Sequence, residues 1–308
     1  MRYAVLFPGQ GSQVVGMAED VLISRPDLLG DAANQALGWD LADTIRNGPE
    51  ELLTQTDRAQ PSLYATSYAV WEAFRAAVAV APSAAAGHSL GEYTALAAAG
   101  VLDYWDGLRL VAARGRAMAN AAGSHPSSMA ALLGADPATA ESVAADRREA
   151  GGALWVANLN SPGQIVLSGG AEDIEWLVAN ARDLGIRRAV QLNVAGGFHS
   201  PLMASAAESL QEALAGVEYG EPAFPVYTNV AAAPADNVAD SLAAQLTSPV
   251  RFEETVNNMV ESGVDTFVHI GPGDVTAGLV KRTAKSATTH VVSSLGEASL
   301  VAHELSVQ

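Results

Sequence analysis

Cysteine is absent from this chain of 308 residues. Its absence excludes disulfide bonds, thiolate ligands for zinc and a cysteine nucleophile, and it gives no sign of an oxidising compartment. Charged residues are also scarce, at 17% of the chain, and 34 acidic side chains outnumber 17 basic ones. The resulting net charge of −17 argues against general nucleic-acid binding.

Long apolar runs are missing as well. The first apolar run ends at Pro8, too early for the hydrophobic region of a signal peptide. The Ala-rich stretch from about residue 65 to residue 102 is interrupted by charged side chains, among them Glu72 and Glu92, so no membrane span fits there. We therefore expect a soluble cytoplasmic protein that neither enters a membrane nor binds nucleic acid.

Hydrophobic residues make up 49% of the chain, enough for a core of normal size, and the length favours about two domains. A short apolar strand that runs into a Gly-rich turn is typical of the start of an α/β domain with a parallel sheet. Outside the middle of the chain, the pattern predicts strands at 3–7 and 266–270, and helices at 62–80, 91–99, 109–122 and after Gly273 to about 285.

The middle of the chain alternates strands and helices in the order β-α-β-β-α-β, which is typical of a ferredoxin-like unit. The expected strands are 129–134, 154–160, 164–169 and 187–193, and the expected helices are 137–149 and 171–183. We predict that this small unit, residues 125–194, is inserted in a large α/β domain made of residues 1–124 and 195–308.

Residues 87–91, Gly-His-Ser-Leu-Gly, fit the G-x-S-x-G pattern of a nucleophile elbow. In such an elbow Ser89 lies on a sharp turn between a strand and a helix, and the glycines allow the backbones to approach each other. The N–H of Leu90 would then point from a helix N-terminus toward a developing oxyanion. The same five residues could instead form a Gly-flanked loop that only turns a corner.

A serine nucleophile needs a general base, and His199 is the best candidate among six histidines. It follows a Gly-Gly-Phe sequence at a crossing between the two domains, where a loop can cover a cleft. His88 adjoins the serine and is interpreted as structural, and His269 lies in an apolar strand and is interpreted as buried. The remaining three fall in segments expected to be loop or terminus: His125, His290 and His303. By residue type alone, His199 could equally be an ordinary loop histidine.

Several short motifs occur in one order along the chain: 7–13 (Phe-Pro-Gly-Gln-Gly-Ser-Gln), 60–61 (Gln-Pro), 87–92 (Gly-His-Ser-Leu-Gly-Glu), 114–118 (Arg-Gly-Arg-Ala-Met), 160–164 (Asn-Ser-Pro-Gly-Gln), 198–199 (Phe-His) and 271–273 (Gly-Pro-Gly). Together they resemble the malonyl-CoA:acyl-carrier-protein transacylases, the acyltransferases of bacterial fatty-acid synthesis. The resemblance extends from Phe7 to about Arg282. It implies a hydrolase-like large α/β domain with a ferredoxin-like insertion, in agreement with the order of strands and helices.

The resemblance also implies roles for the residues that match the motifs. Ser89 corresponds to the acylated serine of the family and His199 to its general base. Gln10 and Leu90 correspond to the pair whose backbone N–H groups form the oxyanion hole.

Arg114 corresponds to the arginine that holds the free carboxylate of the malonyl group. A planar guanidinium can bind a carboxylate through two parallel hydrogen bonds, which a lysine cannot do. Gln60 and Asn160 match positions that line the site or steady its loops. By residue type alone, Arg114 could be a solvated charge on a helix, and Gln10, Gln60 and Asn160 could be turn or cap residues.

The orientation of His199 departs from a full triad, because no Asp or Glu stands out as a third member. The family uses a backbone carbonyl near a Pro-Val-Gln segment, and the corresponding stretch here is Ser248–Arg251. The glycines at 196 and 197 predict a flexible approach to the base. Phe198 immediately precedes His199, a pattern associated with malonyl selection in related acyltransferases.

These expectations combine into a ping-pong acyltransferase. The malonyl group would move from malonyl-CoA to Ser89 and then to the phosphopantetheine thiol of an acyl carrier protein, with no metal and no permanently bound cofactor. A trans-acting acyltransferase of a polyketide pathway would use the same chemistry. A serine esterase or thioesterase needs neither Arg114 nor a carrier, and a non-catalytic carrier-binding subunit gains nothing from Ser89, His199 and Arg114 together.

An acidic carrier protein is an awkward partner for a chain of negative net charge, and it would require a local positive patch. The candidates are two tight basic groups: Arg187 and Arg188, and Lys281 and Arg282. Each of them could also be an ordinary surface charge in a salt bridge. We expect the protein to act as a monomer.

Overall fold

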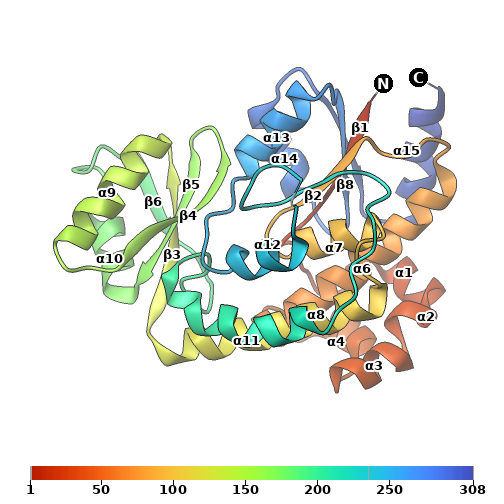
Figure 1. Ribbon diagram of the computed structural model, residues 1–308, viewed down its shortest axis with the longest axis horizontal. Helices are drawn as coiled ribbons and strands as arrows, with labels where there is room; N and C mark the ends of the chain where they lie inside the picture. Colours follow the sequence, from red (N-terminus) through yellow and green to blue (C-terminus); the bar gives the residue numbers. More distant parts are fainter. Residues whose placement is uncertain (1, 235, 308) are drawn as a thin grey trace.

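The computed structural model describes residues 2–234 and 236–307 (Figure 1). Its larger sheet has five parallel strands in the order β7-β2-β1-β8-β9. The strands are β1 (Tyr3–Phe7), β2 (Ala84–Gly87), β7 (Val226–Tyr227), β8 (Thr266–Ile270) and β9 (Thr288–Val292). In β1, Val5 and Phe7 face the main core, whereas Ala4 and Leu6 face a second core on the other side of the sheet. Because both faces are covered, the strand is apolar throughout.

Helices cover both faces of this sheet (Figure 1). The N-terminal helices are α1 (Glu19–Ser24), α2 (Pro26–Leu29), α3 (Asp31–Leu37), α4 (Leu41–Asn47), α5 (Glu50–Leu53), α6 (Thr56–Ala77), α7 (Gly91–Ala98) and α8 (Tyr104–Ser124). The C-terminal ones are the 3-10 helix η1 (Pro201–Met203), α11 (Ala204–Ala215), α12 (Val238–Gln245), α13 (Phe252–Glu261), α14 (Val275–Thr283) and α15 (Leu295–Val307). Helices α6, α7 and α8 contribute to the main core, and α13 and α14 to the second.

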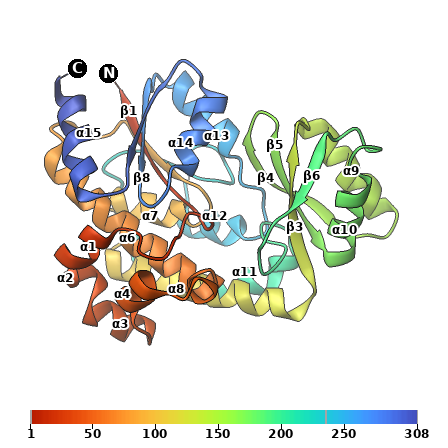
Figure 2. The ribbon, with the colours of Figure 1, turned by 180° about the vertical axis from the view of Figure 1, so that it is seen from behind.

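The smaller sheet is antiparallel and stands beside the first, with its own core (Figure 2). Its strands β3 (Ser127–Leu133), β4 (Leu154–Ser161), β5 (Gln164–Gly170) and β6 (Arg188–Gln191) lie in the order β4-β5-β3-β6. Helices α9 (Pro137–Glu149) and α10 (Ala171–Asn180) pack on its outer face. An α/β fold with a parallel sheet and a ferredoxin-like insertion is thus confirmed.

Several helix and strand ends differ from those expected. The helix expected from residue 62 begins at Thr56 and continues through Pro61, because burial of this turn offsets the one backbone hydrogen bond that proline cannot donate. The helix expected from residue 109 begins at Tyr104, because the Asp103 carboxylate caps it. The helices expected to reach 183 and 285 end at Asn180 and Thr283, and the strand expected at 187–193 spans Arg188–Gln191.

Two histidines lie in regular structure, contrary to expectation: His290 is on β9 and His303 on α15. In the described ranges, no helix combines the length and the apolar character needed to cross a lipid bilayer.

Candidate active site

Ser89 lies on the sharp turn between β2 and α7, with a backbone φ of +50°. The two glycines of the motif are required by close packing. A Cβ on Gly87 would lie 1.8 Å from the carbonyl carbon of Gly91, and a Cβ on Gly91 would lie 2.2 Å from the Phe7 oxygen. The strand therefore passes directly against the helix, and the half-buried serine lines the cavity at the turn, as the elbow motif predicts.

Ser89 and His199 come together although 110 residues separate them in the sequence. The Oγ of Ser89 is 2.8 Å from Nε2 of His199, and Nδ1 of His199 is 2.9 Å from the backbone oxygen of Gln245. A carbonyl oxygen can only accept, so Nδ1 carries the proton and Nε2 is free to accept from the serine hydroxyl. The orienting group is a carbonyl, as expected: the direct hydrogen bond is to Gln245, and the backbone of Ser248, in the expected stretch, also acts on the ring.

His199 is neutral in this site. Burial, assisted by the positive charge of Arg114, lowers the pKa of His199 to about 3. The imidazole therefore holds a vacant nitrogen over the whole physiological pH range, which is the state that a general base requires.

The approach to His199 is tightly packed rather than flexible, which corrects the expectation drawn from the two glycines. A Cβ on Gly196 would lie 2.5 Å from the Cβ of Ala122 on α8. The N–H of Gly197 donates to Ser127 Oγ at 3.0 Å. Glycine is present here because α8 leaves no room for a side chain.

Arg114 is not a solvated charge on a helix, since only 1% of its surface is exposed. Its Nη1 donates to Gln60 Oε1 at 2.8 Å, and its Nη2 donates to Ser89 Oγ at 3.0 Å and to Gln245 Oε1 at 2.9 Å. Within the described residues, its Nε has no hydrogen-bond partner. Helix α8 thus holds a guanidinium directly beside the serine, where it can bind an anionic group carried by an acyl chain.

Two backbone N–H groups are available near the serine. The N–H of Ser89 itself is engaged by Asn229 Oδ1 at 2.7 Å. The N–H groups of Leu90 and Gln10 donate to no acceptor in the described part of the chain. The Gln10 side chain lines the same cavity as Ser89, and its Nε2 lies 3.5 Å from Thr56 Oγ1.

Asn160, on β4, joins the small sheet to the elbow. Its Oδ1 lies 2.7 Å from Nε2 of His88, whose ring packs against Phe252. Burial lowers the pKa of His88, so this histidine is neutral and its contacts are structural, in keeping with the interpretation from sequence.

Three buried polar residues of the site were not expected from the sequence: Glu92, Asn229 and Gln245. Oε2 of Glu92 accepts from Asn229 N and from Gln245 Nε2, both at 2.8 Å. Gln245 Nε2 also donates to Ser89 O at 3.1 Å, and Asn229 Nδ2 donates to Gly87 O at 2.7 Å. These hydrogen bonds fix the backbone of the nucleophile turn. Glu92 ends the motif at residues 87–92, and this was the one available signal, since no motif surrounds the other two.

The site opens into a cavity of about 270 Å³ between the two sheets. Ser89, His199 and Arg114 line its polar part. Apolar side chains from the small sheet, from the segment after β6 and from helices α8 and α14 line the rest: Met118, Met129, Ala131, Val166, Leu192, Val194, Phe198, Val275 and Leu279. Such a mixture suits a flexible thioester arm that ends at Ser89. Within the described ranges, no group of three or more His, Asp or Glu is placed to hold a metal ion.

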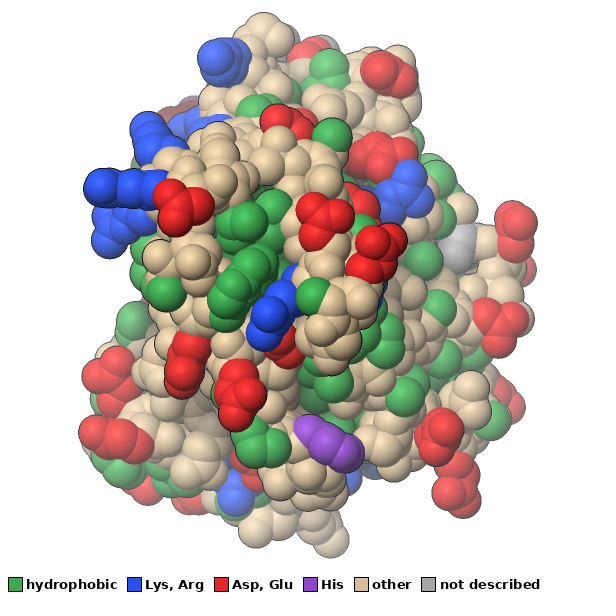
Figure 3. All heavy atoms as spheres, turned by 90° about the vertical axis from the view of Figure 1, so that its left-hand side faces the viewer, with side chains coloured by type: hydrophobic (Ala, Val, Ile, Leu, Met, Phe, Trp, Pro, Cys, Tyr) green, Lys and Arg blue, Asp and Glu red, His purple; other side chains and the backbone are tan. Residues whose placement is uncertain are grey.

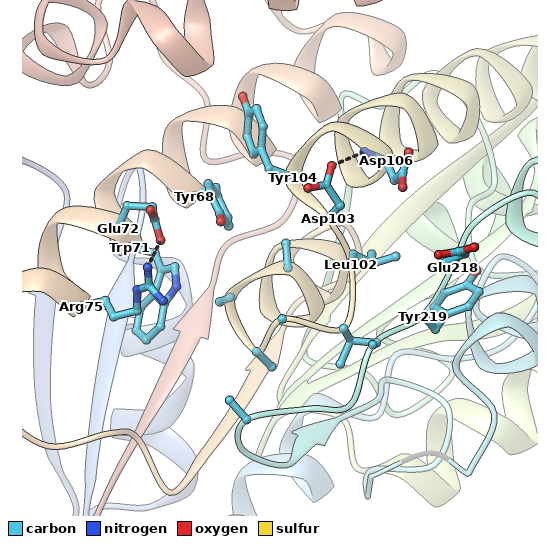
Figure 4. Close-up of a pocket in the computed structure, with 17 residues that line it drawn as sticks. Tyr68, Trp71, Glu72, Arg75, Leu102, Asp103, Tyr104, Asp106, Glu218 and Tyr219 are labelled. Carbon is cyan, nitrogen blue, oxygen red and sulfur yellow. Dashed lines mark hydrogen bonds and ion pairs between the residues drawn. The ribbon is translucent and has the colours of Figure 1, made fainter.

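A larger hollow of about 640 Å³ lies elsewhere, between α6, the start of α8 and residues 218–223 (Figure 4). Its lining includes none of the expected site residues. Three of its carboxylates have structural partners: Glu72 pairs with Arg75, Asp106 pairs with Arg109, and Asp103 caps α8. This hollow offers no nucleophile and base in contact.

The four basic docking candidates are exposed, in two separate places. Lys281 and Arg282 lie near the end of α14, and Arg282 Nη1 donates to Gln164 Oε1 at the rim of the active-site cavity. Arg187 and Arg188 lie at the start of β6 and line a different groove, of about 440 Å³, together with Arg182. On the side of the molecule formed by the small sheet, several basic side chains form a group at one edge, and other basic and acidic side chains are scattered over the rest of the face (Figure 3).

Comparison with known proteins agrees with this geometry. Residues 5–302 match the model of the acyl transferase domain family. The malonyl CoA-acyl carrier protein transacylase of Bacillus subtilis is 43% identical over 297 residues, which cover 95% of this chain and 93% of the relative.

Two solved structures show the same fold. The malonyl CoA-acyl carrier protein transacylase from Coxiella burnetii has a TM-score of 0.94 and 32% identity, with 99% of this chain and 98% of that chain covered. A malonyl-transacylase in complex with its type II PKS acyl-carrier protein has a TM-score of 0.93 and 36% identity, with 99% and 100% covered. In both sequence and structure, this chain therefore belongs to the acyltransferase family of the malonyl CoA-acyl carrier protein transacylases.

Proposed function

We propose that this protein transfers a malonyl group from malonyl-CoA to the phosphopantetheine thiol of an acyl carrier protein, by way of an ester on Ser89. One observation carries the proposal: the Oγ of Ser89 contacts both His199 Nε2 and Arg114 Nη2. A nucleophile, a base and a buried cation therefore meet at a single atom. An esterase of neutral substrates would have no use for the cation, and a binding subunit would need none of the three.

In the first half-reaction, His199 Nε2 accepts the hydroxyl proton while Ser89 Oγ attacks the thioester carbonyl. The backbone N–H groups of Gln10 and Leu90, which are free in the described structure, would donate to the oxyanion. When the tetrahedral intermediate collapses, the C–S bond breaks and the CoA sulfur takes the proton from His199. The serine ester remains, and no metal or resident organic cofactor takes part in any step.

Arg114 would hold the malonyl carboxylate during this step. Its Nη2 is already directed at Ser89 Oγ, and Gln60 and Gln245 fix the guanidinium plane. The carboxylate would also cancel the positive charge that lowers the pKa of His199. An anionic acyl group would therefore make the base stronger, which a neutral acyl group cannot do.

In the second half-reaction, the thiol of the carrier enters the same cavity. His199 accepts the thiol proton, the sulfur attacks the ester carbonyl, and the proton returns to Ser89 Oγ as the ester bond breaks. All the groups come from one chain, so a monomer suffices.

Lys281 and Arg282 are the better-supported docking residues, because Arg282 contacts Gln164 at the rim of the cavity. Arg187 and Arg188 would extend the basic surface on the small sheet. Since exposed charges attract through solvent, transfer to the carrier should slow as salt is added, whereas acylation of Ser89 should change less.

The relatives support two settings for the same chemistry. Fatty-acid synthesis is our first proposal, and transfer to a polyketide carrier is the second, because one structural neighbour is bound to a type II PKS acyl-carrier protein. Comparing kcat/KM on carriers of both kinds would separate the two.

Mass spectrometry of the intact protein tests the proposed reaction. After brief exposure to malonyl-CoA, we expect one adduct of malonyl mass, located on the peptide that contains Ser89. Addition of a holo carrier should then remove the adduct and add the same mass to the carrier. Loss of the adduct to water alone would identify a hydrolase, and absence of any adduct would contradict the proposal.

Replacement of Arg114 by alanine should reduce malonyl transfer by roughly 10- to 1,000-fold. Charge-assisted hydrogen bonds to a buried partner contribute about 1.5–3 kcal/mol, and stranding a buried charge costs about 3–5 kcal/mol. Acetyl-CoA lacks the carboxylate, so its kcat/KM should change little or rise. Arg114→Lys should restore only part of the malonyl activity, because an ammonium lacks the planar fork. Equal losses with both thioesters would show that Arg114 is structural.

A further inference from the structure

Glu92 is a buried carboxylate that the proposed reaction does not use. It lies in the first turn of α7, three residues after the nucleophile, and its side chain has no exposure to solvent. Gln245 connects it to Arg114: Gln245 Nε2 donates to Glu92 Oε2 at 2.8 Å, and Gln245 Oε1 accepts from Arg114 Nη2 at 2.9 Å. A single amide thus separates the buried anion from the buried cation.

The two oxygens of this carboxylate differ in their surroundings. Oε2 accepts both hydrogen bonds, from Asn229 N and Gln245 Nε2. Oε1 is buried and has no partner in the described part of the chain. A proton on Oε1 would therefore leave every observed contact of Glu92 in place. The network can change its charge without changing its hydrogen bonds.

The ability of Glu92 to gain a proton without losing a hydrogen bond matters for the charge balance of the site. When it is ionised, Glu92 compensates the positive charge of Arg114. A malonyl carboxylate beside Arg114 would add a second anion to the same buried space, and burying an uncompensated charge is costly. Protonation of Glu92 would remove this excess negative charge.

We propose that Glu92 takes up a proton when the malonyl carboxylate pairs with Arg114, and that this exchange of counter-charges makes Glu92 a determinant of selectivity for anionic acyl groups. This inference rests on the proposed function, because it requires Arg114 to hold the substrate carboxylate. Acetyl groups bring no charge and would leave Glu92 as it is.

The ionisation of Glu92 is suited to such an exchange. Burial raises the pKa of Glu92 to about 7, and the bonds from Asn229 and Gln245 and the charge of Arg114 limit the rise. Arg114 on α8 is the one charged side chain that acts on it in the described structure. The neighbouring ring of Tyr93 stays protonated and His199 stays unprotonated, because burial raises the pKa of the first and lowers that of the second.

These charges determine the direction in which malonyl transfer changes with pH. Malonyl-CoA would react with the form in which Glu92 is protonated, so its kcat/KM should fall as the pH rises through about 7, by at most a factor of ten per pH unit. Acetyl-CoA shares every other step and should lack this dependence. The ratio of kcat/KM for malonyl-CoA to that for acetyl-CoA therefore isolates the effect.

The experiment measures this ratio between about pH 6.5 and about pH 8.5. We expect the wild-type ratio to fall about 25-fold, and a change smaller than about threefold would overturn the proposal. Glu92→Gln should give a ratio that does not vary with pH. Glu253→Gln, which removes a half-buried carboxyl on α13 whose side chain makes no described hydrogen bond to this network, should behave as wild type. A ratio that still titrates in Glu92→Gln would assign the proton to another group.

Proton uptake gives a second readout that needs no variant to fold. The transfer of malonyl to Ser89 moves the serine proton to the CoA sulfur, so the reaction itself consumes no proton. Calorimetry of wild-type acylation near pH 7.5, in two buffers of different ionisation enthalpy, should show uptake with malonyl-CoA and none with acetyl-CoA. Equal values for both thioesters would overturn the proposal.

Arg114→Ala distinguishes a failure of this inference from a failure of the proposed function. If this variant keeps the wild-type selectivity at low pH, Arg114 does not hold the carboxylate and the proposed function fails. If the variant loses selectivity while the wild-type ratio is independent of pH, the proposed function stands and only the role of Glu92 is wrong.

Discussion

Replacement of Ser89 by alanine should lower the turnover of acyl transfer by as much as about 10⁶-fold, the scale seen when the nucleophile of a Ser/His unit is removed. The loss is large because no other nucleophile lies within reach of His199 Nε2 in the described site. The fold should be retained, since the change removes one oxygen at a turn that the two flanking glycines shape. The measurement is kcat for malonyl transfer, together with thermal unfolding.

Ser62→Ala is a matched control for Ser89→Ala. Ser62 is fully buried on α6, and its Oγ has no partner among the described residues, so its loss should leave transfer unchanged. If the Ser89→Ala variant kept more than a small fraction of wild-type turnover, another residue would have to be the one that is acylated.

Replacement of His199 by alanine should reduce the rate of acylation by roughly 10⁴- to 10⁶-fold, because Ser89 then loses the group that accepts its proton. His269 offers an internal comparison, since it is equally buried but lies on β8 with Nδ1 2.6 Å from Thr276 Oγ1. His269→Gln should lower the melting temperature and leave the acylation rate within a few-fold of wild type. Pre-steady-state acylation by malonyl-CoA measures the rate for both variants, and thermal unfolding measures the melting temperature. An inactive His269 variant beside an active His199 variant would reverse the assignment.

The local parts of the structure were predictable from the sequence because their causes are local. The strand at residues 3–7 and the helix at residues 137–149 have the expected ends, because apolar patterning, Pro8 and the Asp136 cap lie within a few residues of them. The ferredoxin-like order of the small sheet follows from six successive patterns of this kind. Where a boundary was wrong, as at Pro61, packing against α8 outweighed a local signal.

The expected site residues differed in how much the sequence could say about them. The turn at Ser89 could be predicted from the local sequence, since the two glycines that shape it are within two positions of the serine. His199 and Arg114 were matched by motif, but their burial and their common contact with Ser89 Oγ came from the fold. Arg187 and Arg188 were paired in the sequence, yet they line a groove separate from the active-site cavity.

By itself, the sequence determined the nucleophile turn, the α/β class and the inserted antiparallel unit, since each depends on short-range sterics or periodicity. Only the tertiary structure decided what surrounds the nucleophile. Gln245 lies 156 residues from Ser89 and 131 from Arg114, and it reaches both because α12 ends against the elbow. A buried amide or carboxylate such as Gln245 or Glu92 has no periodic signature in the sequence. Its role is set by the donors and acceptors that packing brings to it, because a polar group without water must be satisfied by whichever partners the fold provides.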